Sequence, residues 1–69
     1  MATYKICFNK PEFNRTFAKL RPVLVRKGFL QFYASGDLIV AEYSSEEDQK
    51  QALVRCRPLV KFLGVYTEK

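Results

Sequence analysis

A repeat at an offset of 36 residues is the feature that most constrains the fold of this chain. Self-similarity at a fixed offset indicates a supersecondary unit that occurs more than once. We therefore expect one domain over residues 1–69, with two pseudo-symmetric strand–helix–strand halves at about residues 3–34 and 38–67. The pairs that recur at this offset are Arg21-Pro22 and Arg57-Pro58, Gly28 and Gly64, Asn9 and Ser45, and Glu12 and Asp48.

Four segments have the alternation or the composition of β-strands. Apolar and other side chains alternate over residues 3–8, which is the period of a strand with one buried face. Residues 29–34 and 38–43 are rich in β-branched and aromatic side chains, and the Gly36-Asp37 sequence between them is typical of a hairpin. Residues 64–67 are expected to form a short last strand.

Two segments between these strands have the period of amphipathic helices. Each carries an apolar stripe that can face a sheet. The first stripe consists of Phe13, Phe17, Leu20 and Leu24. The second consists of Ala52, Leu53, Cys56, Leu59, Val60 and Leu63.

Local signals mark where these helices begin. Ser44 is followed three residues later by Glu47, which is the pattern of a capping box. Asn9 and Glu12 form a weaker version at the equivalent place in the first half. Both helices are therefore expected to start with an acidic first turn, which also suits the helix dipole.

Prolines and glycines mark the other ends of the helices. Pro22 and Pro58 lie inside the helical patterns, where each removes a backbone hydrogen bond, so we expect a kink or an early end there. Gly28 and Gly64 follow as residues that tolerate a positive φ. We expect each to end a helix.

The predicted element order is βαββαβ. Right-handed crossovers then give a ferredoxin-like α+β fold, with a four-stranded antiparallel sheet and two helices on one face. Tyr4, Ile6 and Phe8 are expected to face the helices. The other face of the sheet is predicted to be open to solvent or to a partner.

Alternation along the strands predicts the residues of this open face. Lys5 and Cys7 are expected to point outward from the first strand, and Gln31 from the second. If Gln31 points outward, Phe29 and Tyr33 are expected to do so as well, which would make the outer surface unusually apolar. The predicted partner-binding residues of the sheet are Lys5, Cys7, Phe29, Gln31, Tyr33, Leu38 and Val40.

One passage resembles the RNA-recognition-motif domains, which share the βαββαβ order. It runs over residues 40–48 and continues into Ala52-Leu53, and it is similar to the passage from the third strand to the second helix of that family. The resemblance implies single-stranded RNA stacked on aromatic residues of the sheet. The chain departs from the family at Leu38 and Val40, where that family carries stacking aromatics.

Charge points to a second surface. Residues 10–28 contain six basic side chains and one acidic side chain, Glu12, so this segment alone carries a charge equal to the net +5 of the chain. Arg15, Lys19 and Arg26 are predicted to form a row on one face of the first helix, where they could contact phosphates or an acidic protein.

Catalysis has little support in the sequence. The chain has no histidine, no glycine-rich phosphate loop and no cluster of metal-ligating cysteines. We expect no enzyme activity, no catalytic residue, no cofactor and no metal. No apolar run approaches the length of a membrane span and no secretory signal is recognisable, so a cytoplasmic protein that does not bind membranes is expected.

The two cysteines are predicted to be free thiols. Cys7 is expected to point out of the sheet and Cys56 to lie in the second helix, so the sheet would separate them. Cys7 is then expected to be accessible to reagents and Cys56 to be protected.

Two functions fit these features. The first is a small, non-catalytic regulatory protein, such as an inhibitor or adaptor, that binds a protein partner or a second copy of itself through the open sheet face or the basic helix. The second is a module that binds RNA or single-stranded nucleic acid, supported by the isoelectric point of about 9.5 and by Phe29 and Tyr33 as stacking platforms.

Overall fold

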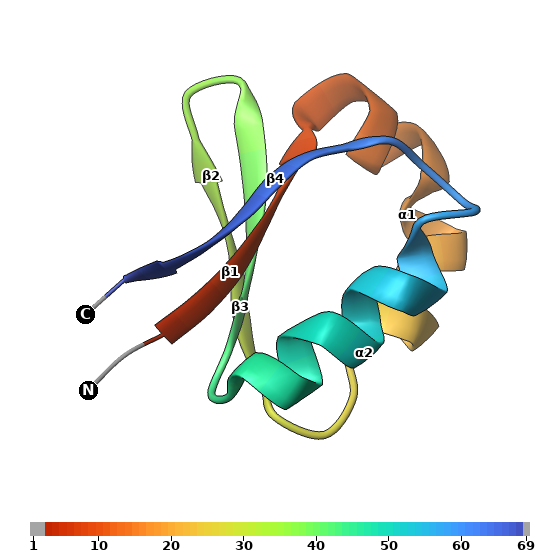
Figure 1. Ribbon diagram of the computed structural model, residues 1–69. Helices are drawn as coiled ribbons and strands as arrows, with labels where there is room; N and C mark the ends of the chain where they lie inside the picture. Colours follow the sequence, from red (N-terminus) through yellow and green to blue (C-terminus); the bar gives the residue numbers. More distant parts are fainter. Residues whose placement is uncertain (1–2, 69) are drawn as a thin grey trace.

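The computed structural model describes residues 3–68, and its elements follow the predicted βαββαβ order. Both helices lie on the same side of the sheet (Figure 1), so the protein has the predicted ferredoxin-like α+β fold. The elements are β1 (Thr3–Asn9), α1 (Lys10–Leu24), β2 (Phe29–Ser35), β3 (Leu38–Tyr43), α2 (Glu46–Cys56) and β4 (Phe62–Glu68).

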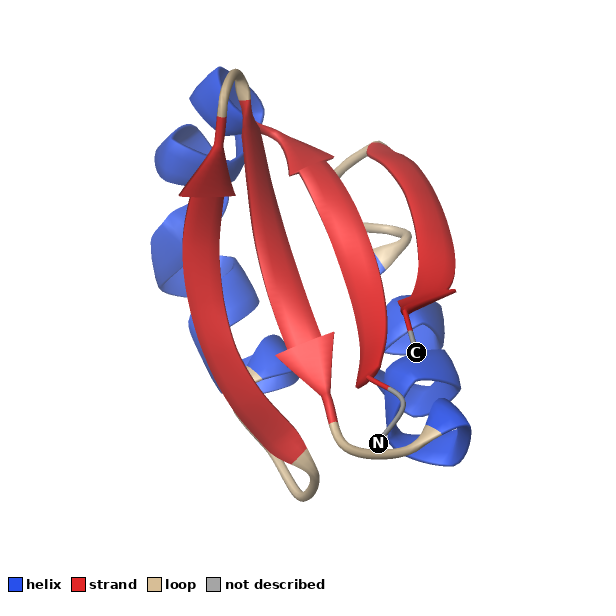
Figure 2. Ribbon diagram, turned by 90° about the vertical axis from the view of Figure 1, so that its left-hand side faces the viewer, coloured by secondary structure: helices blue, strands red, loops and turns tan. Residues whose placement is uncertain are grey.

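The sheet has four strands in the order β2-β3-β1-β4, and each strand is antiparallel to its neighbours. Figure 2 looks onto the face of the sheet that the helices leave uncovered, with the helices behind it. The central strands are therefore β3 and β1, and the edges are β2 and β4. In β4 the strand begins at Phe62, two residues earlier than predicted.

The core lies between the sheet and the two helices. Ile6 and Phe8 of β1 are fully buried in it, and Tyr4 packs against it, which confirms the predicted inward face of this strand. Tyr43 of β3 is also fully buried, and its hydroxyl donates a hydrogen bond of 2.6 Å to the carbonyl oxygen of Leu24. This bond satisfies one of the carbonyl groups that the end of α1 leaves unpaired.

Side-chain caps start both helices at positions 36 residues apart. The Asn9 Oδ1 atom accepts a hydrogen bond of 3.2 Å from the Glu12 amide, and the Ser45 Oγ atom accepts one of 3.2 Å from the Asp48 amide. The cap of α2 is thus Ser45, one residue later than the predicted Ser44. Each cap satisfies one of the amides that would otherwise lack a partner in the first turn.

Both helices end close to their prolines, which agrees with the predicted kink or early end. Pro22 lies within α1, which continues to Leu24, whereas α2 ends at Cys56, before Pro58. The predicted second stripe is therefore wrong beyond Cys56, and Leu63 belongs to β4. Proline near the end of a helix removes only one of the last hydrogen bonds, which α1 tolerates.

The two repeated glycines have different roles. Gly28 has φ +84°, the predicted left-handed conformation, in the connection between α1 and β2. Gly64 instead lies in β4 opposite Cys7 and is not among the glycines with positive φ. Its predicted role at a helix end is wrong.

Phe29 faces the core, contrary to the prediction. A bulge between Phe29 and Gln31 interrupts the alternation of β2, so that Phe29 lies opposite Tyr43 and Gln31 opposite Glu42. The ring centroids of Phe29 and Tyr43 are 5.7 Å apart on the helix side of the sheet. An extra residue in a strand reverses which side chains face the core, and strict alternation cannot foresee it.

Candidate partner-binding surfaces

The outer sheet face is the surface of the sheet that no helix covers. The strand register places on it Lys5 and Cys7 of β1, with Glu42 and Val40 opposite them on β3. Gln31 and Tyr33 of β2 continue the same rows. The predicted residues that the structure brings together on this face are Lys5, Cys7, Gln31, Tyr33, Leu38 and Val40.

A lysine occupies the middle of the outer sheet face between two aromatic rings. The Lys5 Nζ atom lies 5.6 Å from the ring centroid of Tyr33 and 5.6 Å from that of Tyr66. It also lies 3.8 Å from the Glu42 Oε2 atom, and the Lys5 side chain is only 6% exposed. An ammonium group near aromatic faces and a carboxylate is held electrostatically, so this cluster is ordered without a helix above it.

Tyr66 was not among the predicted site residues. It lies opposite Lys5 on β4, and it is 42% exposed. The sequence holds the signal, because Lys5 and Tyr66 become neighbours once β4 is paired with β1. The prediction lacked that register, since the last strand was placed too late and its bulge was not foreseen.

The apolar residues of the outer sheet face are not exposed. Val40 is 1% exposed and Cys7 is 7% exposed, although no helix covers them. Tyr33 and Tyr66 flank this row, and Cys7 is close enough to Tyr66 to contribute to the raised pKa of its hydroxyl. The predictions of an apolar outer surface and of an accessible Cys7 thiol are therefore wrong, because the aromatic rings and the Lys5 side chain shield these groups.

The hydroxyl of Tyr66 has altered acidity. Partial loss of solvent raises the pKa of Tyr66 to about 12, and hydrogen bonding to Cys7 and Tyr33 adds to the effect. A tyrosine is already neutral around neutral pH, and the raised pKa extends this protonated form, which can donate a hydrogen bond, to about pH 12. Such a group can anchor a partner through its ring and its hydroxyl together.

The edge strand β4 carries exposed apolar side chains at the border of the outer sheet face, and Val65 points to the helix side because it lies opposite the inward-facing Ile6. Leu63 is 59% exposed and Val65 is 44% exposed. Within the described residues, β4 pairs with β1 and has no strand on its other side. An edge strand with unpaired backbone groups and exposed apolar side chains is a site where another chain can add.

The predicted basic row is interrupted. Arg15 and Lys19 are exposed on α1, and Arg15 lies 3.7 Å from Glu12. Arg26 lies beyond Leu24, the last residue of α1, and is only partly exposed. It therefore does not continue a helical row, because α1 ends before it. Arg15 and Lys19 lie on α1 and Arg26 lies in the connection after it, so none of the three belongs to the outer sheet face.

The two cysteines are both free thiols, as predicted. Cys56 is fully buried in the core, and burial raises the pKa of its thiol to about 11. Within residues 3–68, no group of three or more histidine, cysteine or acidic side chains is arranged to hold a metal ion. No helix in the same part of the chain is long and apolar enough to cross a membrane.

Comparison with protein-family models, curated proteins and solved structures gives no match to this chain. The chain is thus placed by its fold as a ferredoxin-like α+β protein.

Proposed function

We propose that this protein is a small, non-catalytic interaction module that binds a protein partner through the tyrosine–edge surface. This surface consists of Tyr33 and Tyr66 on the outer sheet face and of Leu63 and Val65 on the adjoining edge strand, where Val65 points to the helix side. The observation that carries the proposal is the pair of tyrosines held around Lys5 beside an exposed apolar edge strand.

The chemistry of the outer sheet face suits a protein interface. Tyrosine is enriched among the residues that contribute most to binding, because it combines a large apolar ring with a hydroxyl and has few rotatable bonds. Lys5 lies near both rings in the free protein, so less side-chain entropy is lost on binding. Gln31 and Glu42, joined by a hydrogen bond of 2.9 Å, supply a polar rim.

The edge of β4 supplies a second mode of contact. A partner strand that pairs with β4 would satisfy its free backbone groups and would cover Leu63 and Val65. Strand addition of this kind derives affinity from backbone hydrogen bonds and specificity from alternating side chains. A second copy of the chain could supply this strand, in which case the partner is a homodimer.

Single-stranded RNA or DNA is the second candidate. Tyr33 and Tyr66 are two aromatic rings on an uncovered sheet, which is an arrangement that can stack bases. The Lys5 ammonium is paired with Glu42, so the centre of this face has little net positive charge. The exposed cations Arg15 and Lys19 lie on α1, away from the rings. Phosphate contacts normally provide most of the affinity for nucleic acid. The separation of the exposed cations from the tyrosine rings therefore favours a protein partner.

The test uses a matched pair of valines. Val65 on β4 and Val54 on α2 are both exposed, at 44% and 66%, so Val65→Lys and Val54→Lys introduce the same charge on different surfaces. The parent and both variants are compared by crosslinking and affinity capture from the native host and by sedimentation velocity. We expect Val65→Lys to lose the captured protein, or the dimer, and Val54→Lys to keep it.

Three results would contradict the proposal. Equal binding by the parent and Val65→Lys would exclude the edge strand. Loss of binding only in Val54→Lys would move the interface to the helices. Binding of single-stranded RNA that weakens steeply with salt and requires Tyr66 would favour the nucleic-acid function instead.

A further inference from the structure

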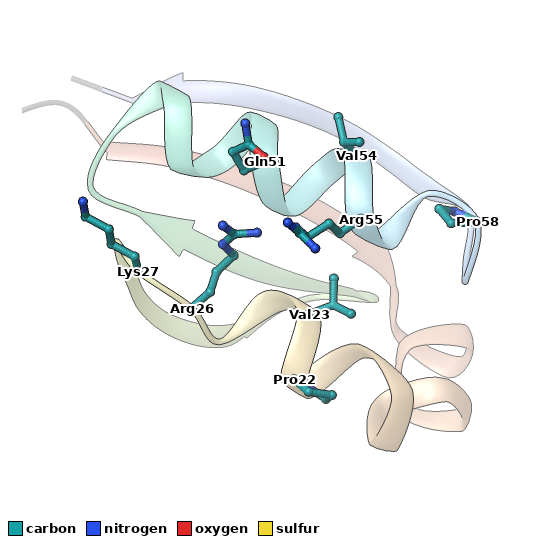
Figure 3. Close-up of a pocket in the computed structure, with 8 residues that line it drawn as sticks. All are labelled: Pro22, Val23, Arg26, Lys27, Gln51, Val54, Arg55 and Pro58. Carbon is teal, nitrogen blue, oxygen red and sulfur yellow. The ribbon is translucent and has the colours of Figure 1, made fainter.

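A groove lies between the end of α1 and the face of α2, on the helix side of the molecule. Its volume is about 720 Å³, which is within the size range of sites for small ligands. Figure 3 shows the residues that line it. They are Pro22, Val23, Arg26, Lys27, Gln51, Val54, Arg55 and Pro58.

The charges of this groove are all positive. Arg26, Lys27 and Arg55 line it, and none of the lining residues is acidic. None of these three cations forms an ion pair with a carboxylate in the described part of the chain. The groove therefore lacks a counter-charge of its own.

Arg26 carries a polar atom without a partner. Its Nε atom is buried and has no hydrogen-bond acceptor in the structure. Buried nitrogen donors are almost always paired in folded proteins, so the Arg26 guanidinium has hydrogen-bonding capacity that no protein group in the described residues uses. In Figure 3 the guanidinium groups of Arg26 and Arg55 are turned toward one another, although both are positively charged. An anion between them would relieve this repulsion and would accept hydrogen bonds from both.

Part of the groove wall is apolar. Val23 of α1 and Val54 of α2 line it, together with Pro22 and Pro58. The exposed fraction of Val54 is 66%, so its side chain is accessible to a ligand in the groove. The ligand that complements the groove thus has an anionic end and an apolar body.

We propose that this groove binds a nucleotide, with the phosphates between Arg26 and Arg55 and the base against Val23 and Val54. Paired guanidinium groups match phosphate geometry, and three cations match the charge of a nucleoside diphosphate. The site lies on the helix side, away from Tyr33 and Tyr66, so it is independent of the proposed partner surface. A small ligand bound here would give the interaction module a second, separately occupied site.

The first experiment is calorimetric titration with ADP, inorganic pyrophosphate and a ten-nucleotide single-stranded RNA, at low and moderate salt. Arg55→Ala removes an exposed cation and should preserve the fold, whereas Arg26 is partly buried and is kept intact. Arg15→Ala is the matched control, because Arg15 is also exposed but lies near the start of α1. We expect saturable binding of ADP that weakens about tenfold or more in Arg55→Ala and is unchanged in Arg15→Ala.

The second measurement locates the ligand. Amide chemical shifts in the NMR spectrum should change with ADP at Val23 to Gly28 and at Gln51 to Arg55, and not on β4. Absence of saturable ADP binding at concentrations of about 1 mM would overturn the proposal. Equal weakening in Arg15→Ala, or shifts confined to the sheet, would also overturn it. Pyrophosphate binding as tightly as ADP would refute the role of the apolar wall, and tighter, Arg55-dependent RNA binding would refute a small ligand.

Discussion

The Lys5 ammonium and the Glu42 carboxylate lie 3.8 Å apart in the middle of a sheet face that no helix covers. Both side chains are largely buried, at 6% and 12% exposure. The pair is shielded by side chains of its own sheet, among them the flanking ring of Tyr66. The Lys5–Glu42 pair and the tyrosine rings are thus one cluster of side chains in mutual contact.

The first prediction concerns this charge pair. Lys5→Met and Glu42→Gln should each destabilise the protein by about 1–3 kcal/mol, because each leaves a poorly solvated polar group with one partner fewer. The double variant should lose less free energy of unfolding than the two single losses added together, and the difference, the coupling energy, should be about 1 kcal/mol. Urea unfolding of the four proteins measures this coupling. Additive effects would show that the two groups do not interact.

The second prediction concerns the shielding of Cys7. Tyr66→Ala should increase the rate at which Cys7 reacts with an alkylating reagent in the folded protein, because the ring and hydroxyl of Tyr66 are removed from above the thiol. Cys56 is fully buried in the core and provides the internal control. Mass spectrometry of labelled peptides distinguishes the two sites. Fast labelling of Cys7 in the parent protein would refute the shielding.

The third prediction concerns Gly28. Its φ is +84°, and a Cβ atom there would overlap the Asp48 carboxylate, so Gly28→Ala combines backbone strain with a steric clash. Gly36 also has a positive φ, +60°, but a Cβ atom there would meet nothing. We expect Gly36→Ala to cost about 1 kcal/mol and Gly28→Ala at least about 2 kcal/mol more, measured by thermal or urea unfolding. Equal costs would show that Asp48 moves away freely.

The fourth prediction concerns alkaline pH. Burial raises the pKa of Cys56 from 9.0 to about 11, so between these values the folded protein holds a thiol proton that the unfolded chain releases. Stability is thus fully present below about pH 9 and is lost as the pH rises toward 11. In Cys56→Ala the loss over this range should be smaller, although the variant is less stable at neutral pH. Parallel stability curves for the two proteins would contradict the assignment to Cys56.

The fold could be predicted because local signals agree with one another. Three features depend only on the geometry of residues close in the sequence: the alternation in residues 3–8, the hairpin turn at Gly36 and the two helical stripes. Together they define the βαββαβ order. The caps at Asn9 and Ser45 follow from the same local chemistry. The structure corrected the end of α2 and the start of β4 by a few residues, since such boundaries depend on tertiary packing.

The surfaces were harder to predict because they depend on contacts between distant residues. The bulge in β2 turned Phe29 inward, and the register of β4 brought Tyr66 beside Lys5. Gln49 is a further example. The sequence predicts an ordinary polar residue on a helix surface. In the structure the Gln49 side-chain amide is buried and donates hydrogen bonds of 2.8 Å and 3.3 Å to the carbonyl oxygens of Lys5 and Tyr66. No local pattern in the sequence encodes these pairings.

The most direct test of the proposed partner surface is hydrogen–deuterium exchange of the free protein and of its complex with the captured partner or second copy. We predict that those amides of β4 within residues 63–66 that point away from β1 become protected in the complex, because a partner strand satisfies them and covers Val65. Amides of α1 around Lys19 should exchange at the same rate in both states. Protection confined to the helices, with β4 unchanged, would contradict the account.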